Sequence, residues 1–233
     1  MSDDLFMERR GEVALVTLNR PQKRNALSIE LRLEMARAFE ELAADDGVGC
    51  VLLTGAGTAF CSGMDTTQFG GDQENRSRLA ESSFAAFGAV ASCSKSVVAA
   101  VNGPAIAGGF ALSLLCDIRI AADTARMGFP ELPAGIPPAY AAARATLDAG
   151  LARELCLTGR VLEAREALDR GVVCALHSTA DLPAAALQLA ESIAAQPRAA
   201  TLETKRRILI ERETTWGPLF EREQQAMREA LLG

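Results

Sequence analysis

Several residue types on which common catalytic sites depend are scarce or absent in this sequence. It has one histidine, one tryptophan and one tyrosine in 233 residues. A Ser-His-Asp triad needs a histidine base, yet His177 stands beside a short apolar run and no G-x-S-x-G segment is present. P-loop and G-x-G-x-x-G phosphate-binding segments are also missing. We therefore expect neither a serine hydrolase nor a dinucleotide-fingerprint enzyme, and we interpret His177 as structural.

The cysteines form no pattern that would hold a metal or a disulfide framework. No C-x-x-C pair occurs, and no histidines cluster near a cysteine. We expect scattered, reduced thiols and no metal site. The six residues concerned are Cys50, Cys61, Cys93, Cys116, Cys156 and Cys174.

Long apolar runs and an excess of positive charge are missing as well. The first segment, MSDDLFMERRGEVALV, opens with acids, and its apolar run is too short for a signal-peptide core. No stretch approaches the ~20 apolar residues of a membrane span. The 24 basic and 30 acidic residues give a net charge of −6, which opposes binding to a nucleic-acid backbone. We expect a cytoplasmic protein with no membrane span and no nucleic-acid partner.

The sequence does contain enough apolar material for one α/β domain. Hydrophobic residues make up 49% of the chain, and the length fits one domain of that class. Short β-branched runs alternate with longer helical segments, which predicts a mainly parallel sheet joined by helical crossovers rather than by two-residue hairpins. Strands are expected at 12–18, 50–54, 97–101, 116–121 and 172–176, and helices after Ser28, near residue 77 and from Gly108.

Two regions differ from this alternating pattern. The loop FPELPAGIPP at 129–138 is too rich in proline to stay helical and is expected to be stiff. From residue 197 the chain becomes amphipathic, so we divide it into a core at 1–196 and a carboxy-terminal helical region at 197–233. That region either packs on its own domain or forms a subunit interface. Its apolar stripe consists of Trp216, Phe220, Met227 and Leu231.

Glycines follow two of the expected strands and could expose backbone amides. Gly108 and Gly109 begin a helix after the strand at 97–101, and a helix amino terminus carries free N–H groups and partial positive charge. The segment GAGTAFCSGMD follows the strand at 50–54 in a similar way. Two amides that converge on one oxygen form an oxyanion hole, in which each donor contributes about 3 kcal/mol to transition-state stabilisation.

Five segments, taken in order, resemble the enoyl-CoA hydratase/isomerase family, also called the crotonase family. The resemblance implies an α/β fold built as a spiral of ββα units, followed by helices that usually form trimers, often paired into hexamers. It also implies an acyl-coenzyme A thioester as substrate, with no cofactor besides the coenzyme A that the substrate carries. The matching segments are LNRPQKRNALS at 18–28, LLTGAGTAFCSGMD at 52–65, KSVVAAVNGPAIAGGFALSLLCDIRIA at 95–121, FPELPAGIPP at 129–138 and LTGRVLEAREALDRGVV at 157–173.

The same resemblance assigns roles to individual positions. The oxyanion amides would belong to Met64 and Gly108, and they would hold the thioester oxygen as it becomes an enolate. The segment PQKRNAL would meet the nucleotide end of coenzyme A, with Lys23 or Arg24 near its phosphates and Ala26 contributing backbone contacts. Backbone groups around Ser62, Asp65 and Thr66 would meet the adenine.

The acid/base residues depart from the family's hydratases, which use two glutamates. Ala111 stands at the first position and Glu131 at the second, and residues 103–116 contain no carboxylate, histidine or lysine. A carboxyl tucked among Phe129, Leu132 and Ile136 would have a raised pKa. One carboxyl suits a proton shuttle, so the resemblance favours an isomerase that converts 3-enoyl-CoA to 2-enoyl-CoA with Glu131 as its single acid/base.

Other functions stay open at this point. An enoyl-CoA hydratase is the nearest alternative, with Glu131 performing both tasks or with a further residue that the sequence does not identify. Decarboxylation and carbon–carbon bond formation, both found in the family, would use the same oxyanion hole. A non-catalytic acyl-CoA-binding protein is a different class of function, and Ala111 is the feature that points to it.

Overall fold

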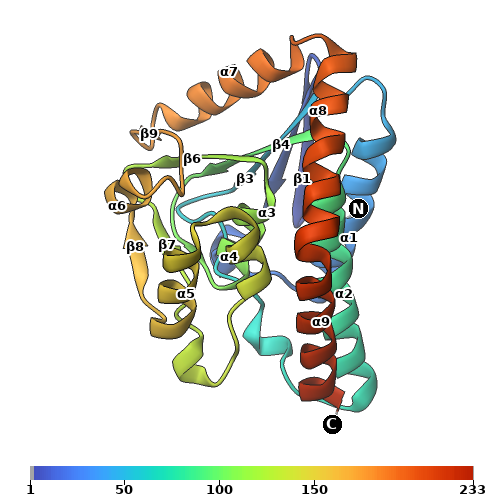
Figure 1. The fold of residues 1–233 in the computed structure, drawn as a ribbon, viewed down its shortest axis with the longest axis vertical. Coiled ribbons are helices and arrows are strands. Elements are labelled where there is room, and N and C mark those ends of the chain that lie inside the picture. Colours follow the sequence, from blue (N-terminus) through green and yellow to red (C-terminus); the bar gives the residue numbers. More distant parts are fainter. Residues whose placement is uncertain (1–2, 233) are drawn as a thin grey trace.

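A six-stranded sheet forms the centre of the computed structural model, which describes residues 3–232 and side chains as far as residue 229 (Figure 1). The strands lie in the order β1-β2-β3-β4-β6-β9, and β2, β3, β4, β6 and β9 run parallel. Both faces of this sheet are covered at its centre, so the central strands are near-continuous apolar runs. They are β1 (Leu5–Arg10), β2 (Val13–Leu18), β3 (Cys50–Gly55), β4 (Ser96–Val101), β6 (Ile118–Ala122) and β9 (Leu176–His177).

A second, three-stranded sheet lies beside the first and carries short strands that the sequence did not predict. It consists of β5 (Ala105–Ile106), β7 (Arg126–Gly128) and β8 (Val161–Glu163), in the order β5-β7-β8. The pairing of Ile106 with Gly128 joins the chain just before α3 to the chain just before the proline-rich loop. This small sheet therefore places those two segments side by side.

Helices pack on both faces of the main sheet. On one face α7 covers a small core that includes Val98, Ile120 and Ala186, and the larger core lies on the other face. Ser28 caps α1, where its side chain accepts a hydrogen bond from the Leu31 amide, as expected from the sequence. The α-helices are α1 (Ile29–Ala44), α2 (Gln73–Ser92), α3 (Gly108–Leu115), α4 (Tyr140–Thr146), α5 (Ala149–Thr158), α6 (Ala164–Asp169), α7 (Leu182–Ala194), α8 (Arg198–Glu211) and α9 (Gly217–Leu232).

Two of the expectations about strands are wrong. The chain begins with β1, which pairs antiparallel with β2 through a two-residue turn at Gly11 and Glu12, whereas no such hairpin was expected. Gly11 has a φ of +59°, which suits the left-handed geometry of this turn. The strand expected at 172–176 is reduced to β9, because Val172 and Val173 instead hydrogen-bond to the Ala167 carbonyl at the end of α6.

The carboxy-terminal region packs on its own domain. Buried Lys205 of α8 forms an ion pair with Asp117, 2.5 Å between Nζ and Oδ2, and Arg212 donates a hydrogen bond to the Ala91 carbonyl at the end of α2. Half-buried Phe220 packs against the main core, while the side chain of Leu231 lies outside the described residues. In Figure 1, α8 and α9 form a nearly continuous rod alongside α1 and α2. Within residues 3–232, no helix combines the length and apolar character that a membrane span requires.

Candidate functional site

The two glycine-bearing segments meet, as the oxyanion-hole prediction required. A Cβ atom built on Gly108 would lie 3.6 Å from Gly63 Cα and 3.8 Å from the Met64 amide nitrogen. The contact is held by the Ile106 amide, which donates a hydrogen bond to the Cys61 carbonyl at 2.9 Å. Segments that follow β3 and β4 thus converge at the carboxyl ends of these parallel strands.

The amides of Met64 and Gly108 are free to bind an oxygen atom. The Leu27 amide donates a hydrogen bond to the Gly63 carbonyl at 2.8 Å, and the Leu27 carbonyl accepts one from the Asp65 amide at 3.1 Å. In this parallel pairing the N–H group of Met64, which lies between Gly63 and Asp65, points away from Leu27. Gly108 is the first residue of α3, where no intrahelical acceptor exists for its N–H group. Among residues 3–232 neither amide donates a hydrogen bond. This arrangement is the donor pair that an oxyanion hole needs.

The turn that presents Gly108 is tightly constrained. Ala107 has φ +54° and ψ −124°, a conformation that costs a non-glycine residue of order 1–3 kcal/mol. It is held because its amide donates to the Gly128 carbonyl at 2.9 Å and its carbonyl accepts from the Ala111 amide at 3.0 Å. At Gly109 a Cβ atom would lie only 2.1 Å from the Cys61 carbonyl oxygen, so a side chain there would collide with backbone.

Glu131 stands on the loop that the hydrogen bond from the Ala107 amide to the Gly128 carbonyl ties to the turn at Gly108. It directly precedes a short 3₁₀ turn, Leu132–Ala134, and follows Gly128, the residue bonded to Ala107, by three positions. Its Oε2 atom is buried and has no hydrogen-bond partner within the described residues. Burial raises the pKa of Glu131 to about 7, which confirms the direction expected from the sequence.

The surroundings of Glu131 match the expectation only in part. Phe129 is fully buried and packs against Phe110 of α3, with ring centroids 4.9 Å apart and the ring planes tilted by 50°. Ile136 is half-buried, whereas Leu132 is exposed. Ala111 is buried in α3 near its first turn, so this helix brings no second carboxyl group to the site.

The segment predicted to meet coenzyme A is an exposed turn with a firmly anchored base. Lys23 and Arg24 are both exposed. Buried Asn25 fixes the turn, because its side chain donates to the Ala56, Ala59 and Phe60 carbonyls and accepts from the Arg20 amide. Two exposed cations are therefore carried on a backbone turn that buried hydrogen bonds fix.

The other predicted coenzyme-contacting residues lie beside this turn. The Ser62 amide donates to the Arg24 carbonyl at 3.0 Å, and Thr66 is exposed. The Ala26 amide already donates a hydrogen bond to the Lys23 carbonyl. The Ala26 carbonyl oxygen accepts a hydrogen bond from Arg20, and its second lone pair can accept one from a ligand. The Asp65 carboxylate accepts bonds from Arg20 and Thr67, which makes its side chain part of the scaffold.

The sequence analysis did not single out two side chains with a structural role, Arg20 and Glu223. Arg20 lies within the motif LNRPQKRNALS and bridges Asp65 and the Ala26 carbonyl, so it holds the turn that is predicted to meet coenzyme A to the Met64 segment. Glu223 of α9 accepts a hydrogen bond from the Ala141 amide at 2.7 Å, and burial raises the pKa of its carboxyl to about 7. Glu223 could have been noticed in the sequence because it lies on the apolar stripe, three residues after Phe220 and four before Met227.

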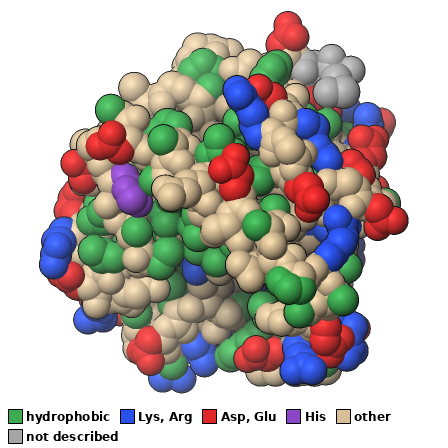
Figure 2. All heavy atoms as spheres, turned by 90° about the horizontal axis from the view of Figure 1, so that it is seen from above, with side chains coloured by type: hydrophobic (Ala, Val, Ile, Leu, Met, Phe, Trp, Pro, Cys, Tyr) green, Lys and Arg blue, Asp and Glu red, His purple; other side chains and the backbone are tan. Residues whose placement is uncertain are grey.

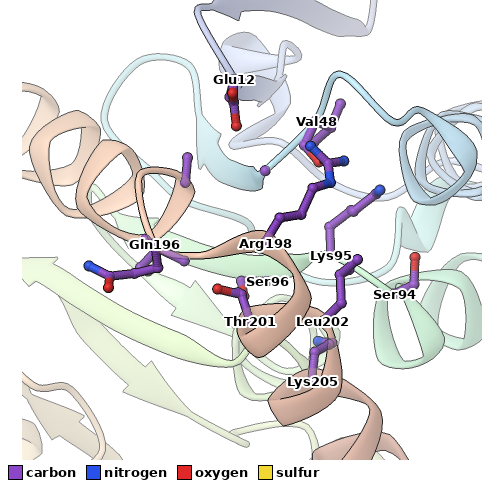
Figure 3. Close-up of a pocket in the computed structure, with 13 residues that line it drawn as sticks. Glu12, Val48, Ser94, Lys95, Ser96, Gln196, Arg198, Thr201, Leu202 and Lys205 are labelled. Carbon is purple, nitrogen blue, oxygen red and sulfur yellow. The ribbon is translucent and has the colours of Figure 1, made fainter.

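Two other features lie away from the site. A small cavity of about 20 Å³ has room for about one water molecule. It lies where β3 and β4 begin, at the end of the main sheet opposite Gly63 and Gly108 (Figure 3). Lys95, Arg198 and Lys205 are among its lining residues. The single histidine, His177, is half-buried in the edge strand β9 and is visible on the surface in Figure 2, beside hydrophobic side chains.

Comparisons with known proteins agree with this fold. The family profile described as "Enoyl-CoA hydratase/isomerase" matches residues 8–228. The chain is 37% identical over 199 residues to enoyl-CoA hydratase EchA19 of Mycobacterium tuberculosis, which covers 82% of this chain and 75% of that protein. It is 32% identical to a short-chain-enoyl-CoA hydratase of Clostridium acetobutylicum, over 88% of this chain and 81% of that one. A crystal structure of an enoyl-CoA hydratase/isomerase from Mycobacterium paratuberculosis superposes with a TM-score of 0.93 at 28% identity, covering 100% of this chain and 95% of that one.

Proposed function

Because the chain belongs to the enoyl-CoA hydratase/isomerase family, we propose that it converts 3-enoyl-CoA thioesters to 2-enoyl-CoA thioesters through an enolate. The observation that carries this proposal is the pairing of one buried, unpartnered carboxyl group, on Glu131, with Ala111 where the family's hydratases carry a second glutamate. A group with a pKa of about 7 both accepts and releases a proton near neutral pH.

The proposed reaction follows from where each group lies. The carboxylate of Glu131 removes a proton from C2 of the acyl chain, and the electron pair passes to the thioester oxygen. The amides of Met64 and Gly108 stabilise the resulting dienolate oxygen. Return of a proton to C4 forms the C2=C3 double bond and restores the thioester carbonyl. In its simplest form, Glu131 performs both transfers.

Coenzyme A binding is assigned to the exposed turn beside the oxyanion segments. Lys23 and Arg24 would pair with the phosphates, and the Ala26 carbonyl and backbone groups of Ser62, Asp65 and Thr66 would contact the adenine. The exposure of both cations on an anchored backbone supports this assignment. The reaction would need no cofactor besides the coenzyme A of its substrate.

We also propose that the protein assembles into a homotrimer or hexamer and acts in the cytoplasm. The support for this is the family resemblance, together with aliphatic side chains that α8 leaves exposed in the single chain. These are Leu202, Ile208 and Ile210.

Hydration of 2-enoyl-CoA is the second candidate, and the names of the relatives favour it. Water addition needs a base to activate water and an acid to protonate C2. On the segments that the family uses for this purpose, the chain offers only Glu131. For that reason isomerisation is the primary proposal.

Separate incubation with a 3-enoyl-CoA and a 2-enoyl-CoA tests the assignment. We expect the 3-enoyl substrate to be conjugated, which is seen as growth of the absorbance of the α,β-unsaturated thioester. Dominant water addition to the 2-enoyl substrate would replace the isomerase assignment with a hydratase. Saturable binding of both thioesters without turnover of either would instead indicate a binding protein.

The pKa of Glu131 also predicts the pH dependence of the isomerase. Its carboxyl must be ionised to remove the C2 proton, and its pKa is raised to about 7 in the folded protein. Activity should therefore fall as pH drops through about 7, approaching a tenfold loss per pH unit. A profile of kcat/KM from pH 5 to 8 measures this limb. A midpoint near 4.5, the ordinary pKa of a glutamate, would contradict the role of a buried base.

A further inference from the structure

Lys95, the residue just before β4, is a buried lysine without a counterion. Only 4% of its surface is exposed, and its ammonium group forms no ion pair or hydrogen bond with any residue that the structure describes. Lysine is rarely buried to this extent without a partner, because its ammonium group loses hydration on burial. The other buried lysine, Lys205, has such a partner, since it pairs with the Asp117 carboxylate at 2.5 Å. The charge of Lys95 is therefore left for water or an ion to compensate.

Lys95 lines the small cavity at the end of the main sheet where the parallel strands begin (Figure 3). In that view Lys95 comes from the start of β4 and Arg198 from the start of α8. The cavity volume of about 20 Å³ suits a single particle of roughly the size of a water molecule. The unpaired lysine therefore borders a space that one small occupant can fill.

Several hydrogen-bond donors around this cavity have no acceptor among the described residues. Lysine and arginine side chains donate hydrogen bonds and accept none. Arg198 uses one N–H group for the Val48 carbonyl, at 3.0 Å, and its other N–H groups remain available. The Ser96 hydroxyl forms no hydrogen bond with any residue that the structure describes. Helix α8 begins at Arg198, and the amino terminus of a helix carries partial positive charge. An occupant that accepts hydrogen bonds would find donors on two elements.

The charges of the lining favour an anion over a cation or a neutral molecule. Three cations line the cavity, Lys95, Arg198 and Lys205, together with one carboxylate, that of Glu12. Asp117 neutralises Lys205, and Glu12 is exposed to solvent. Three cations against these two carboxylates leave one positive charge, and Lys95 is the buried cation without a partner. One monovalent anion would balance it, whereas a cation would be repelled.

We propose that this cavity binds one small monovalent anion of the size of chloride, held by the Lys95 ammonium group with Arg198 and Ser96 as further donors. Phosphate, sulfate and organic carboxylates are too large for the space. The bound anion joins the start of β4 to α8 and so stabilises the packing of the carboxy-terminal region on the sheet. The site is independent of the proposed isomerase function, because it lies at the opposite end of the sheet from Gly63 and Gly108.

Thermal unfolding at constant ionic strength tests the proposal, with chloride exchanged for gluconate, whose anion is too large for the cavity. A site that is half-filled at about 20 mM chloride raises the melting temperature of the parent protein by about 3–6 °C at about 200 mM, since only the folded chain binds. Lys95→Met keeps the length of the side chain without its charge and should show no such rise. In gluconate this variant should melt at or above the parent's temperature, because it buries no unpaired charge. Arg37→Met, exposed on α1, is the matched control and should keep the parent's response.

Bromide, which resembles chloride in size and charge, shows directly what fills the cavity. In crystals of the parent protein soaked in sodium bromide, we expect an anomalous-scattering peak beside the Lys95 ammonium group, and no such peak in Lys95→Met. A cavity that holds only water would overturn the proposal. A peak that Lys95→Met retains would also do so, because it would mark an adventitious ion only. A rise in melting temperature with chloride that is equal in the parent and in Lys95→Met would likewise contradict the site, since it would reflect a general effect of salt.

Discussion

Replacing Glu131 with glutamine should lower kcat for 3-enoyl-CoA isomerisation by about 10⁴-fold, near the upper end of the effects seen for general acid–base groups. The reason is that Glu131 begins the reaction: without an ionisable oxygen, no dienolate forms for the oxyanion amides to stabilise. We expect a large loss because a carboxyl group with a pKa of about 7 both accepts and releases protons efficiently near neutral pH, and glutamine can do neither. Exchange of the C2 hydrogens with D₂O should disappear in the same variant.

The measurement is steady-state turnover of a 3-enoyl-CoA, with binding of a saturated acyl-CoA as the check on folding. Binding should stay within threefold of the parent, since glutamine has nearly the same volume as glutamate. Glu163→Gln serves as the control, because this acid lies exposed on neighbouring β8 and, among the residues that the structure describes, forms an ion pair only with Arg126. Turnover by Glu131→Gln within a few-fold of the parent would remove Glu131 from the mechanism.

Replacing Gly108 with alanine should lower kcat by about 10³-fold without unfolding the protein. The added methyl group would lie 3.8 Å from the Met64 amide nitrogen, in the space where a thioester oxygen must sit to reach both donors. Loss of one oxyanion donor typically costs 10²–10³-fold, and a methyl group in the hole weakens contact with both. The fold tolerates this change because the nearest atom, on the Phe87 ring, is 3.5 Å away, an ordinary van der Waals contact.

Two other glycines supply the comparison. Gly88→Ala, in α2, meets no atom within 4 Å and should keep full activity with stability unchanged or slightly raised. Gly109→Ala should instead destabilise the protein, because its Cβ atom would collide with the Cys61 carbonyl oxygen. Thermal unfolding separates the cases: normal melting with lost turnover is expected only for Gly108→Ala. Normal turnover in that variant would show that the thioester oxygen lies elsewhere.

Much of the local structure could be predicted from the sequence because it depends on neighbouring residues. Ser28 caps α1 through the Leu31 amide, and Gly108 opens α3, since both signals act within one helical turn. The β1–β2 hairpin escaped prediction because Glu8, Arg9 and Arg10 hide the apolar alternation of an edge strand. Strand β9 is shorter than expected because the Val172 and Val173 amides donate hydrogen bonds to the Ala167 carbonyl at the end of α6.

The sequence by itself determined which groups are available: glycine amides after two parallel strands, a carboxyl group in a stiff proline-rich loop, and no carboxyl group in the helix that begins at Gly108. Only the tertiary structure decided which of them meet. The small β5–β7 pairing ties the turn at Gly108 to the Glu131 loop, and the return of α9 onto α2 and α4 half-buries Glu223 at the start of α4. Such meetings depend on contacts between residues far apart in the chain, and the burial that raises both pKa values exists only once those contacts have formed.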